Sequence, residues 1–160
     1  MAEELHLVPT TDKEERYKSL LPQLESLIAP ESNLIANLAN VSAALKQAFD
    51  WWWVGFYWVE NEELVLGPFQ GPIACTRIAM HRGVCGSAWA EKKTLIVPNV
   101  HEFPGHIACS AASNSEIVIP ILKNNVVIGV LDCDSEHFNH FDNIDQIYLE
   151  KLVELIATKA

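Results

Sequence analysis

The stretch Glu116–Asp134, EIVIPILKNNVVIGVLDCD, determines how the rest of the chain folds. It contains two runs rich in valine and isoleucine, 116–122 and 126–134, on either side of Lys123-Asn124-Asn125. β-Branched runs around a short asparagine turn are typical of a β-hairpin. Because side chains alternate between the two faces of a strand, Asp132 and Asp134 share one face of this hairpin.

The pairing register of the hairpin depends on its loop. We expect a three-residue loop with Asn125 in the left-handed region, which pairs Leu122 with Val126 and places Glu116 opposite Asp132. We prefer it to a two-residue loop because it collects the apolar side chains on one face, namely Ile117, Ile119, Ile121, Val127, Leu131 and Cys133. The other face then carries three clustered carboxylates: Glu116, Asp132 and Asp134.

Three neighbouring carboxylates suggest acid chemistry. Mutual repulsion and partial burial raise the pKa of at least one of them toward neutrality, so that it can donate a proton at neutral pH. The alternative is a solvated strand end with three ordinary surface acids.

The rest of the chain supplies helices at both ends and further strands between them. Amphipathic helices are expected over 11–28, with Thr11 and Glu14 in capping-box spacing, over 34–49 and over 142–159. Strands are expected at 51–60, 64–69, 73–80 and 94–97, a short helix at 85–91 and a long loop at 98–115. We therefore expect one α+β domain over 1–160, an antiparallel sheet with helices packed against it, and residues 1–10 as a flexible or loosely packed arm.

Charge and composition exclude several classes of function. The 160 residues contain 21 acidic and 11 basic side chains, a net charge of -10, which disfavours nucleic acid as a partner. No apolar run approaches the roughly 18 residues of a membrane span. The amino terminus is acidic and polar, unlike a secretory signal, so we expect a cytoplasmic protein. Its four cysteines then suggest redox chemistry or a metal before structural disulfides.

The cysteines differ in their surroundings. Cys109 lies in the long loop beside His101 and His106 and is the first candidate nucleophile. A second thiol could come from Cys75 or Cys85, and the start of the 85–91 helix is expected to lower the pKa of Cys85.

Two further assignments concern core and metal. Cys133 falls on the packed face of the hairpin and is expected to be a small buried core residue. A zinc site would use His101, His106, Cys109 and either Cys75 or Cys85, but the compact C-x2-C pairs of closed zinc sites are missing.

Five tryptophans include four in the segment 51–58. Strand alternation points Trp51, Trp53 and Tyr57 to one face and Trp52, Phe56 and Trp58 to the other. One or two of these rings are expected to line a pocket for a methyl or a cationic group.

Four separate motifs point to a known family. They are GPFQGPIAC at 67–75, RGVCGSAW at 82–89, FPGHIACS at 103–110 and SEIVIP at 115–120. In this order and spacing they resemble the free methionine-(R)-sulfoxide reductases, stand-alone GAF-domain enzymes, from about Tyr17 onward. The resemblance implies a six-stranded antiparallel sheet flanked by helices, a cytosolic enzyme without cofactor or metal, and reduction of the free amino acid but not of protein-bound residues.

The resemblance also implies residue roles. Cys109 matches the attacking cysteine, Cys75 the resolving cysteine and Cys85 a third redox-linked thiol. Other matches are to the groups that hold the substrate: Glu116, Asp132 and Asp134 for the sulfoxide oxygen and Trp53 for the methyl group. Cys133 departs from the family, which more usually has an aliphatic residue there.

The implied reaction proceeds through a cysteine sulfenic acid at Cys109 and an intramolecular disulfide, which a thioredoxin-type dithiol reduces. Expected partners are therefore free methionine sulfoxide and that reductant, and a homodimer stays open. Two rival functions stay open as well: a non-catalytic GAF module that senses a small molecule, and a zinc-binding structural protein.

Overall fold

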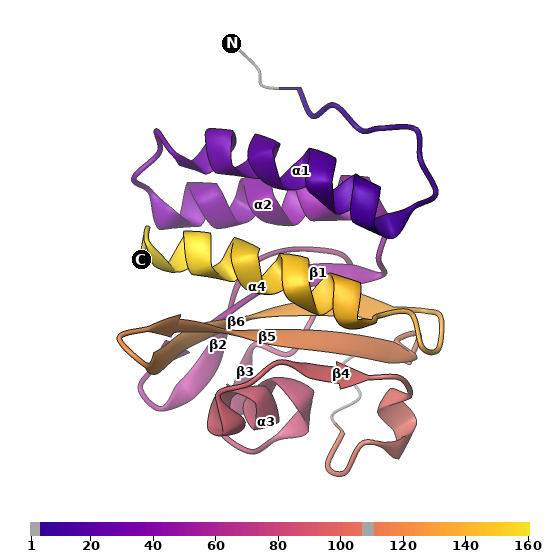
Figure 1. The fold of residues 1–160 in the computed structure, drawn as a ribbon. Helices are drawn as coiled ribbons and strands as arrows, with labels where there is room; N and C mark the ends of the chain where they lie inside the picture. The colour runs from indigo at the N-terminus through magenta and orange to yellow at the C-terminus, as the bar shows by residue number, and fades with distance from the viewer. Residues whose placement is uncertain (1–3, 107–110) are drawn as a thin grey trace.

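The computed structural model describes residues 4–106 and 111–160. Within these ranges the elements follow one another as α1 (Lys13–Ile28), α2 (Leu34–Phe49), β1 (Trp53–Glu60), β2 (Glu63–Gln70), β3 (Arg77–Ala79), α3 (Gly83–Glu91), β4 (Leu95–Val97), the 3-10 helix η1 (Val100–Glu102), β5 (Ser115–Lys123), β6 (Val126–Ser135) and α4 (Asn143–Ala157). The strands form one antiparallel sheet in the order β3-β2-β1-β6-β5-β4 (Figure 1). The expected α+β class and the six-stranded sheet are confirmed.

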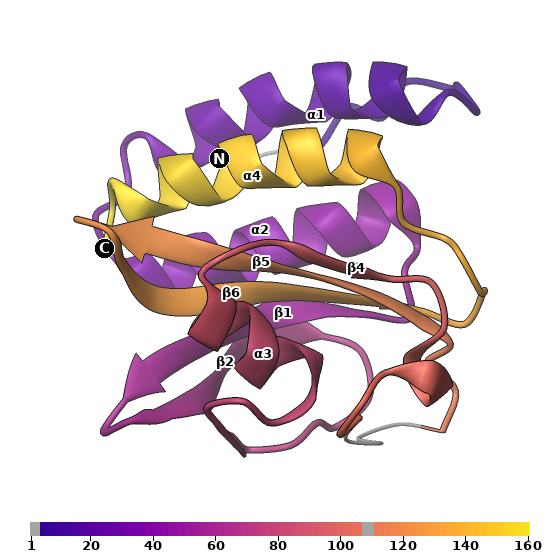
Figure 2. The same ribbon diagram turned by 60° about the horizontal axis from the view of Figure 1, so that its bottom comes forward.

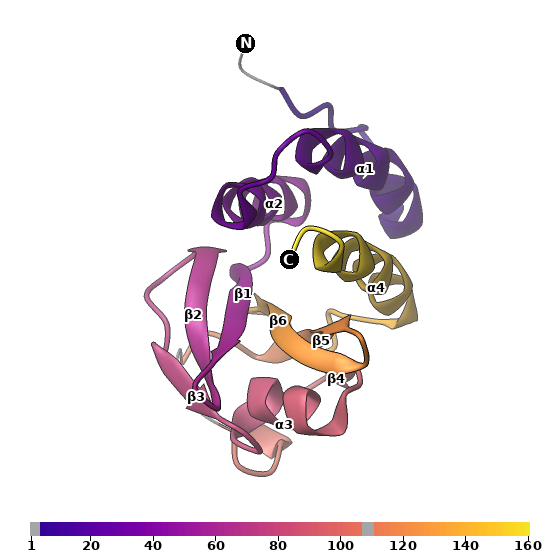
Figure 3. The ribbon, with the colours of Figure 1, turned by 90° about the vertical axis from the view of Figure 1, so that its left-hand side faces the viewer.

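The sheet separates two apolar cores. Helices α1, α2 and α4 cover one face, and α3 covers the other (Figure 3). The first core, here the helix-side core, buries the periodic side chains of α1 (Tyr17, Leu20, Leu24, Ile28) against those of α2, α4 and the sheet. The second, here the α3-side core, is smaller and contains Trp53, Tyr57, Cys85 and Val118. In the described part of the chain, none of the helices is long and apolar enough to cross a membrane.

The β5–β6 hairpin forms where predicted, but in a different register. Its loop has two residues, Asn124 and Asn125, both with positive φ (52° and 61°), and Lys123 pairs with Val126. Asparagine tolerates this left-handed backbone, which a tight hairpin turn requires at both central positions. The predicted three-residue loop and the pairing of Leu122 with Val126 are therefore wrong.

A bulge restores the predicted faces. Between Ile121 and Leu122 the register shifts, because Leu122 pairs with Val127 and Ile121 with Gly129, so that β6 has one extra residue. Beyond the bulge Glu116 lies opposite Asp134, not Asp132 as predicted, yet both aspartates stay on the face of Glu116. The expected apolar face is also found, except that the bulge turns Val127 into the α3-side core.

Three local expectations need correction. Strand β1 begins only at Trp53, so alternation does not extend to the two preceding tryptophans: Trp51 lies in the helix-side core and Trp52 against the α3-side core, the reverse of the prediction. The predicted strand 73–80 is limited to β3. Helix α1 is capped by Asp12, whose carboxylate accepts from the Glu15 N–H at 2.9 Å, and not by Thr11.

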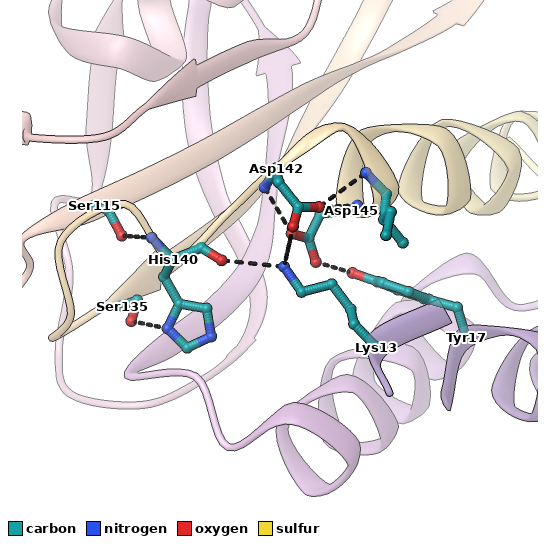
Figure 4. Close-up of polar contacts among 8 residues, drawn as sticks. Lys13, Tyr17, Ser115, Ser135, His140, Asp142 and Asp145 are labelled. Atoms are coloured by element: carbon teal, nitrogen blue, oxygen red, sulfur yellow. Dashed lines mark hydrogen bonds and ion pairs between the residues drawn. The ribbon is translucent and has the colours of Figure 1, made fainter. Parts of the chain in front are cut away.

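A partly buried ion pair joins α1 to the start of α4 (Figure 4). Lys13 Nζ lies 2.5 Å from Asp145 Oδ2 and donates to the His140 carbonyl at 3.1 Å, while the Tyr17 hydroxyl donates to Asp145 Oδ1 at 2.7 Å. The His140 ring in turn shares a 2.5 Å hydrogen bond with Ser135 Oγ at the end of β6. This network fixes the strand end that follows Asp134 to the helical layer.

We expect Lys13→Met to lower the free energy of unfolding by about 3 kcal/mol, because Asp145 is 1% exposed and loses the cation that compensates its charge. Urea denaturation measures the loss. The matched control is Lys18→Met, which removes an exposed ion pair with Glu14 and changes stability by less than about 1 kcal/mol. The double variant Lys13→Met/Asp145→Asn should recover part of the loss, and an unchanged stability of Lys13→Met would contradict this account.

Candidate active site

A pocket opens on the face of the sheet that α3 covers. Figure 2 shows α3 on the side of the sheet opposite to α4. The floor of the pocket consists of strand side chains, and its walls come from α3 and from the segment 72–74 that precedes β3. The lining includes Trp53, Tyr57, Cys85, His106, Ser113, Glu116, Asp132 and Asp134.

The sheet register brings the three carboxylates together. In β6, Asp134 pairs with Trp53 on one side and with Glu116 on the other. Asp132 pairs with Gly55 of β1, where a Cβ atom would come within 2.6 Å of the Trp53 ring. Because position 55 lacks a side chain, the Trp53 ring can lie beside the acids. The predicted cluster therefore forms, although through other cross-strand pairs.

Aromatic side chains of β1 form a second wall and hold the segment that carries Cys75. Trp53 is buried and stacks on Phe69, with ring centroids 5.2 Å apart. Its indole N–H donates to the Pro72 carbonyl at 3.0 Å, and the Tyr57 hydroxyl donates to the Cys75 carbonyl at 2.9 Å. The shared face of Trp53 and Tyr57 was predicted from strand alternation; their hydrogen bonds to the segment before β3 were not.

Burial makes the carboxylates weak acids. It is the main cause that raises the pKa of Glu116 and of Asp132 well above their ordinary values, and the neighbouring acids add to it. The pKa of Asp134 rises from 3.8 to about 6, again by burial, although the Ser113 hydroxyl donates to its Oδ1 at 2.6 Å and opposes the rise. The expected rise of at least one carboxyl pKa toward neutrality is thus found.

Cys85 behaves differently from the prediction. It is the third residue of α3, where the helix end was expected to lower the pKa of its thiol. Burial and the nearby charges of Asp132 and Glu116 instead raise this pKa well above 9.0. The Sγ atom lies 3.9 Å from Glu116 Oε1, and burial together with the carboxylates outweighs the helix end and keeps the thiol protonated.

The remaining cysteines fall into separate classes. Cys75 is disulfide-bonded, whereas Cys85 and Cys133 have free thiols. Cys133 is fully buried in the helix-side core, which confirms its predicted role as a packing residue. Cys109, the predicted nucleophile, lies outside the described residues.

The predicted zinc ligands are not brought together in the described part of the chain. His101 Nε2 lies 2.9 Å from Asn114 Oδ1, and of the two histidines only His106 lines the pocket, together with Cys85. Burial lowers the pKa of His106, with a smaller effect from His101. The disulfide of Cys75 also removes that thiol as a ligand.

Comparison with known proteins gives the family. The GAF domain pattern matches residues 37–158. The chain is 60% identical to GAF domain-containing protein A of Dictyostelium discoideum, over 98% of this chain and 99% of that protein. It is 50% identical to the free methionine-R-sulfoxide reductase of Escherichia coli, over 89% and 87% of the two chains. The crystal structure of the Neisseria meningitidis free methionine-R-sulfoxide reductase in complex with its substrate superposes with a TM-score of 0.95, at 51% identity over 98% and 94% of the two chains.

The chain belongs to the free methionine-(R)-sulfoxide reductases. The resemblance found in the sequence motifs is thereby confirmed, as is the GAF fold. Five of the residues that were matched to this family from the sequence line one pocket: Trp53, Cys85, Glu116, Asp132 and Asp134.

Two reductase pocket residues were missed by sequence reasoning. Ser113 reaches Asp134 only because the chain before β5 passes over the end of β6, and Arg82 lines the pocket as the residue before α3. Arg82 begins the motif at 82–89, but neither residue could be assigned to the pocket, because both contacts depend on loop paths. Strand alternation could have found only residues within the strands.

We expect the raised pKa of Asp134 to appear in the pH dependence of stability. Between pH 3.8 and about 6 the folded protein keeps a proton on Asp134 that the unfolded chain releases. The free energy of unfolding of the wild type should therefore fall relative to Asp134→Asn as pH rises from about 4 to about 7, by up to about 3 kcal/mol. Denaturant titrations of both proteins at several pH values measure this difference. A difference that is flat or increases with pH would contradict the assignment.

Proposed function

We propose that this chain reduces free L-methionine (R)-S-oxide to L-methionine, with Cys109 as nucleophile and the three carboxylates as the group that protonates the sulfoxide oxygen. The observation that carries the proposal is the cluster of buried Glu116 and Asp132 with half-buried Asp134, beside an aromatic wall in one pocket. It occurs in a chain of the reductase family, whose Neisseria meningitidis member has been solved with its substrate.

In the first step the Cys109 thiolate attacks the sulfoxide sulfur. A sulfoxide is a poor electrophile until its oxygen accepts a proton, which a protonated carboxyl of the cluster donates. Cys109 gains the oxygen as a sulfenic acid, and methionine, reduced by two electrons, leaves. Burial raises the pKa of Glu116 and of Asp132 well above their ordinary values and so favours their protonated forms. Asp132 Oδ1 has no hydrogen-bond partner among the described residues, so it is available to the substrate.

In the second step the Cys75 thiol attacks the sulfenic sulfur. A disulfide forms and the oxygen leaves as water. Support comes from Cys75 itself, which is disulfide-bonded, while Cys85 and Cys133 have free thiols. An external dithiol of the thioredoxin type then reduces the disulfide, and a cytoplasmic location would supply this reductant.

Substrate size and orientation follow from the pocket walls. The pocket lies between α3 and the segment before β3, and its aromatic and acidic side chains suit a small polar substrate such as a free amino acid. Trp53 offers a buried aromatic face for the methyl group on the substrate sulfur. Cys85, 3.9 Å from Glu116, is a further thiol close to the acids that can exchange with a disulfide once it is deprotonated.

The experiment that tests the proposal follows NADPH oxidation through thioredoxin reductase and thioredoxin with either sulfoxide epimer. We expect turnover of the free R epimer only. A GAF module that senses a small molecule would bind it without consuming NADPH, so absence of turnover with an intact fold would reject the reductase function.

Cys109→Ser should abolish turnover, because a hydroxyl is too weakly acidic to replace the thiolate. Cys75→Ser should allow one turnover per chain and impair cycling, since the sulfenic acid then lacks its resolving thiol. Rapid-quench measurement of methionine per enzyme separates the two variants. The matched control is Cys133→Ala, a core thiol on the opposite face, which should keep the activity of the folded protein. Normal turnover by Cys109→Ser would show that the nucleophile is another residue.

Asp134→Asn should slow the chemical step about 100-fold or more while substrate binding changes little, because an amide hydrogen bonds but cannot transfer its proton. Single-turnover rates at saturating substrate measure this effect. Glu136→Gln is the control, since that exposed acid lies two residues further along, outside the pocket. An unchanged single-turnover rate for Asp134→Asn would remove Asp134 from the proton-donating group.

A further inference from the structure

Three side chains in the pocket form a group of metal-ligand type. One atom each of Cys85 (Sγ), Glu116 and Asp132 (a carboxylate oxygen) lies within 4.8 Å of the other two, and all three residues are buried. The described part of the chain brings together no other such group of three. These residues come from α3, β5 and β6, so the tertiary fold and not a local sequence motif assembles them.

A second observation points to a missing ligand. Asp132 is 7% exposed, lines the pocket, and its Oδ1 has no hydrogen-bond partner among the described residues. A buried carboxylate oxygen is normally satisfied, so an unpartnered one marks a place for a proton donor or a cation. Arg82 is the basic side chain among the described lining residues, and it is exposed.

The distances suit a tetrahedral ion after small rotations. Zinc binds thiolate at about 2.3 Å and carboxylate oxygen at about 2.0–2.2 Å, which separates tetrahedral sulfur and oxygen ligands by about 3.5 Å. Cys85 Sγ and Glu116 Oε1 are already 3.9 Å apart. Three protein ligands leave the fourth position open toward the pocket, as in sites where the ion exchanges or binds a further molecule.

We propose that Cys85, Glu116 and Asp132 bind one Zn²⁺ ion in this pocket and that the ion reversibly blocks the site of the sulfoxide oxygen. The blocking rests on the proposed reductase function; the binding does not. A thiolate among the ligands selects a borderline or soft ion such as Zn²⁺ or Cd²⁺ and disfavours Mg²⁺. On binding, the Cys85 thiol and any protonated carboxyl release their protons to solvent, and no oxidant or reductant takes part.

Binding is tested with Cd²⁺, whose bonds to thiolate give a charge-transfer absorption in the ultraviolet. The protein used is the full chain with Cys75→Ser and Cys109→Ser, which keeps Cys85 and Cys133 as its thiols. We expect one Cd²⁺ per chain with this absorption, displaced by Zn²⁺ and not by Mg²⁺. Absence of the band would overturn the proposal.

Matched variants in the same background identify the ligands. Cys85→Ser should remove the band, whereas Cys133→Ala should keep it, because Cys133 lies in the opposite core. Glu116→Gln and Asp132→Asn should each keep a folded pocket and weaken Cd²⁺ binding by at least about tenfold. Even mutation of residues that only hydrogen bond to a metal ligand typically lowers metal affinity about 10–100-fold. These two variants test the site if Cys85→Ser fails to fold. A band that survives Cys85→Ser, or affinities unchanged in both acid variants, would place the ion elsewhere.

Inhibition is measured separately, on the reduced wild-type protein in single turnovers without thioredoxin. Zn²⁺ should slow methionine formation, a higher sulfoxide concentration should relieve the inhibition, and chelation should restore the full rate. Inhibition that a higher sulfoxide concentration does not relieve would contradict the proposal that Zn²⁺ and the sulfoxide oxygen occupy the same site. If the protein lacks reductase activity altogether, the Cd²⁺ band still decides the binding, so failure of the two proposals can be told apart.

Discussion

The alternation of side chains along β6 is the constraint on which the rest of the structure depends. Leu131 and Cys133 enter the helix-side core, so Asp132 and Asp134 must both face the other side of the sheet. Since β6 lies between β1 and β5, these acids meet Trp53 from one neighbour and Glu116 from the other. A one-residue slip would place two carboxylates among the helices and two apolar side chains in the pocket, which makes the register of this strand a condition for both folding and chemistry.

Burying three acids in one pocket destabilises the protein, and other parts of the fold offset this. Desolvation raises the pKa of each acid, so above the ordinary carboxyl pKa the folded state holds protons that the unfolded chain releases; for Asp134 this range ends near pH 6. The helix-side core lies on the opposite face of the same strands and includes most of the apolar surface of α1, α2 and α4. The Lys13–Asp145 ion pair and the Ser135–His140 contact fix the end of β6, next to Asp134, against those helices (Figure 4).

The sequence predicted those features of the structure that depend on a single local rule, and it failed for features that depend on several elements at once. Strand alternation correctly placed Glu116, Asp132 and Asp134 on one face, and helical periodicity gave α2 and α4 almost to the residue. The predicted register of the β5–β6 hairpin was wrong because a two-residue turn followed by a bulge puts the carboxylates on the same face of the sheet as a three-residue loop does. The pattern of apolar and acidic residues therefore does not distinguish the two. The predicted pKa shift of Cys85 was wrong because local sequence shows the helix start, whereas the burial and the carboxylates that outweigh it depend on strands thirty and more residues away.

The raised pKa of Cys85 gives the pocket two distinct states. Burial and the surrounding acids keep Cys85 a thiol and therefore a poor nucleophile. A cation beside Glu116 and Asp132 reverses that balance, because positive charge favours the thiolate and the carboxylates at once. Protons and a thiophilic ion therefore compete for the same three side chains. The buried acidity that suits the pocket to sulfoxide reduction is the same property that makes it a metal-binding site when the protons leave.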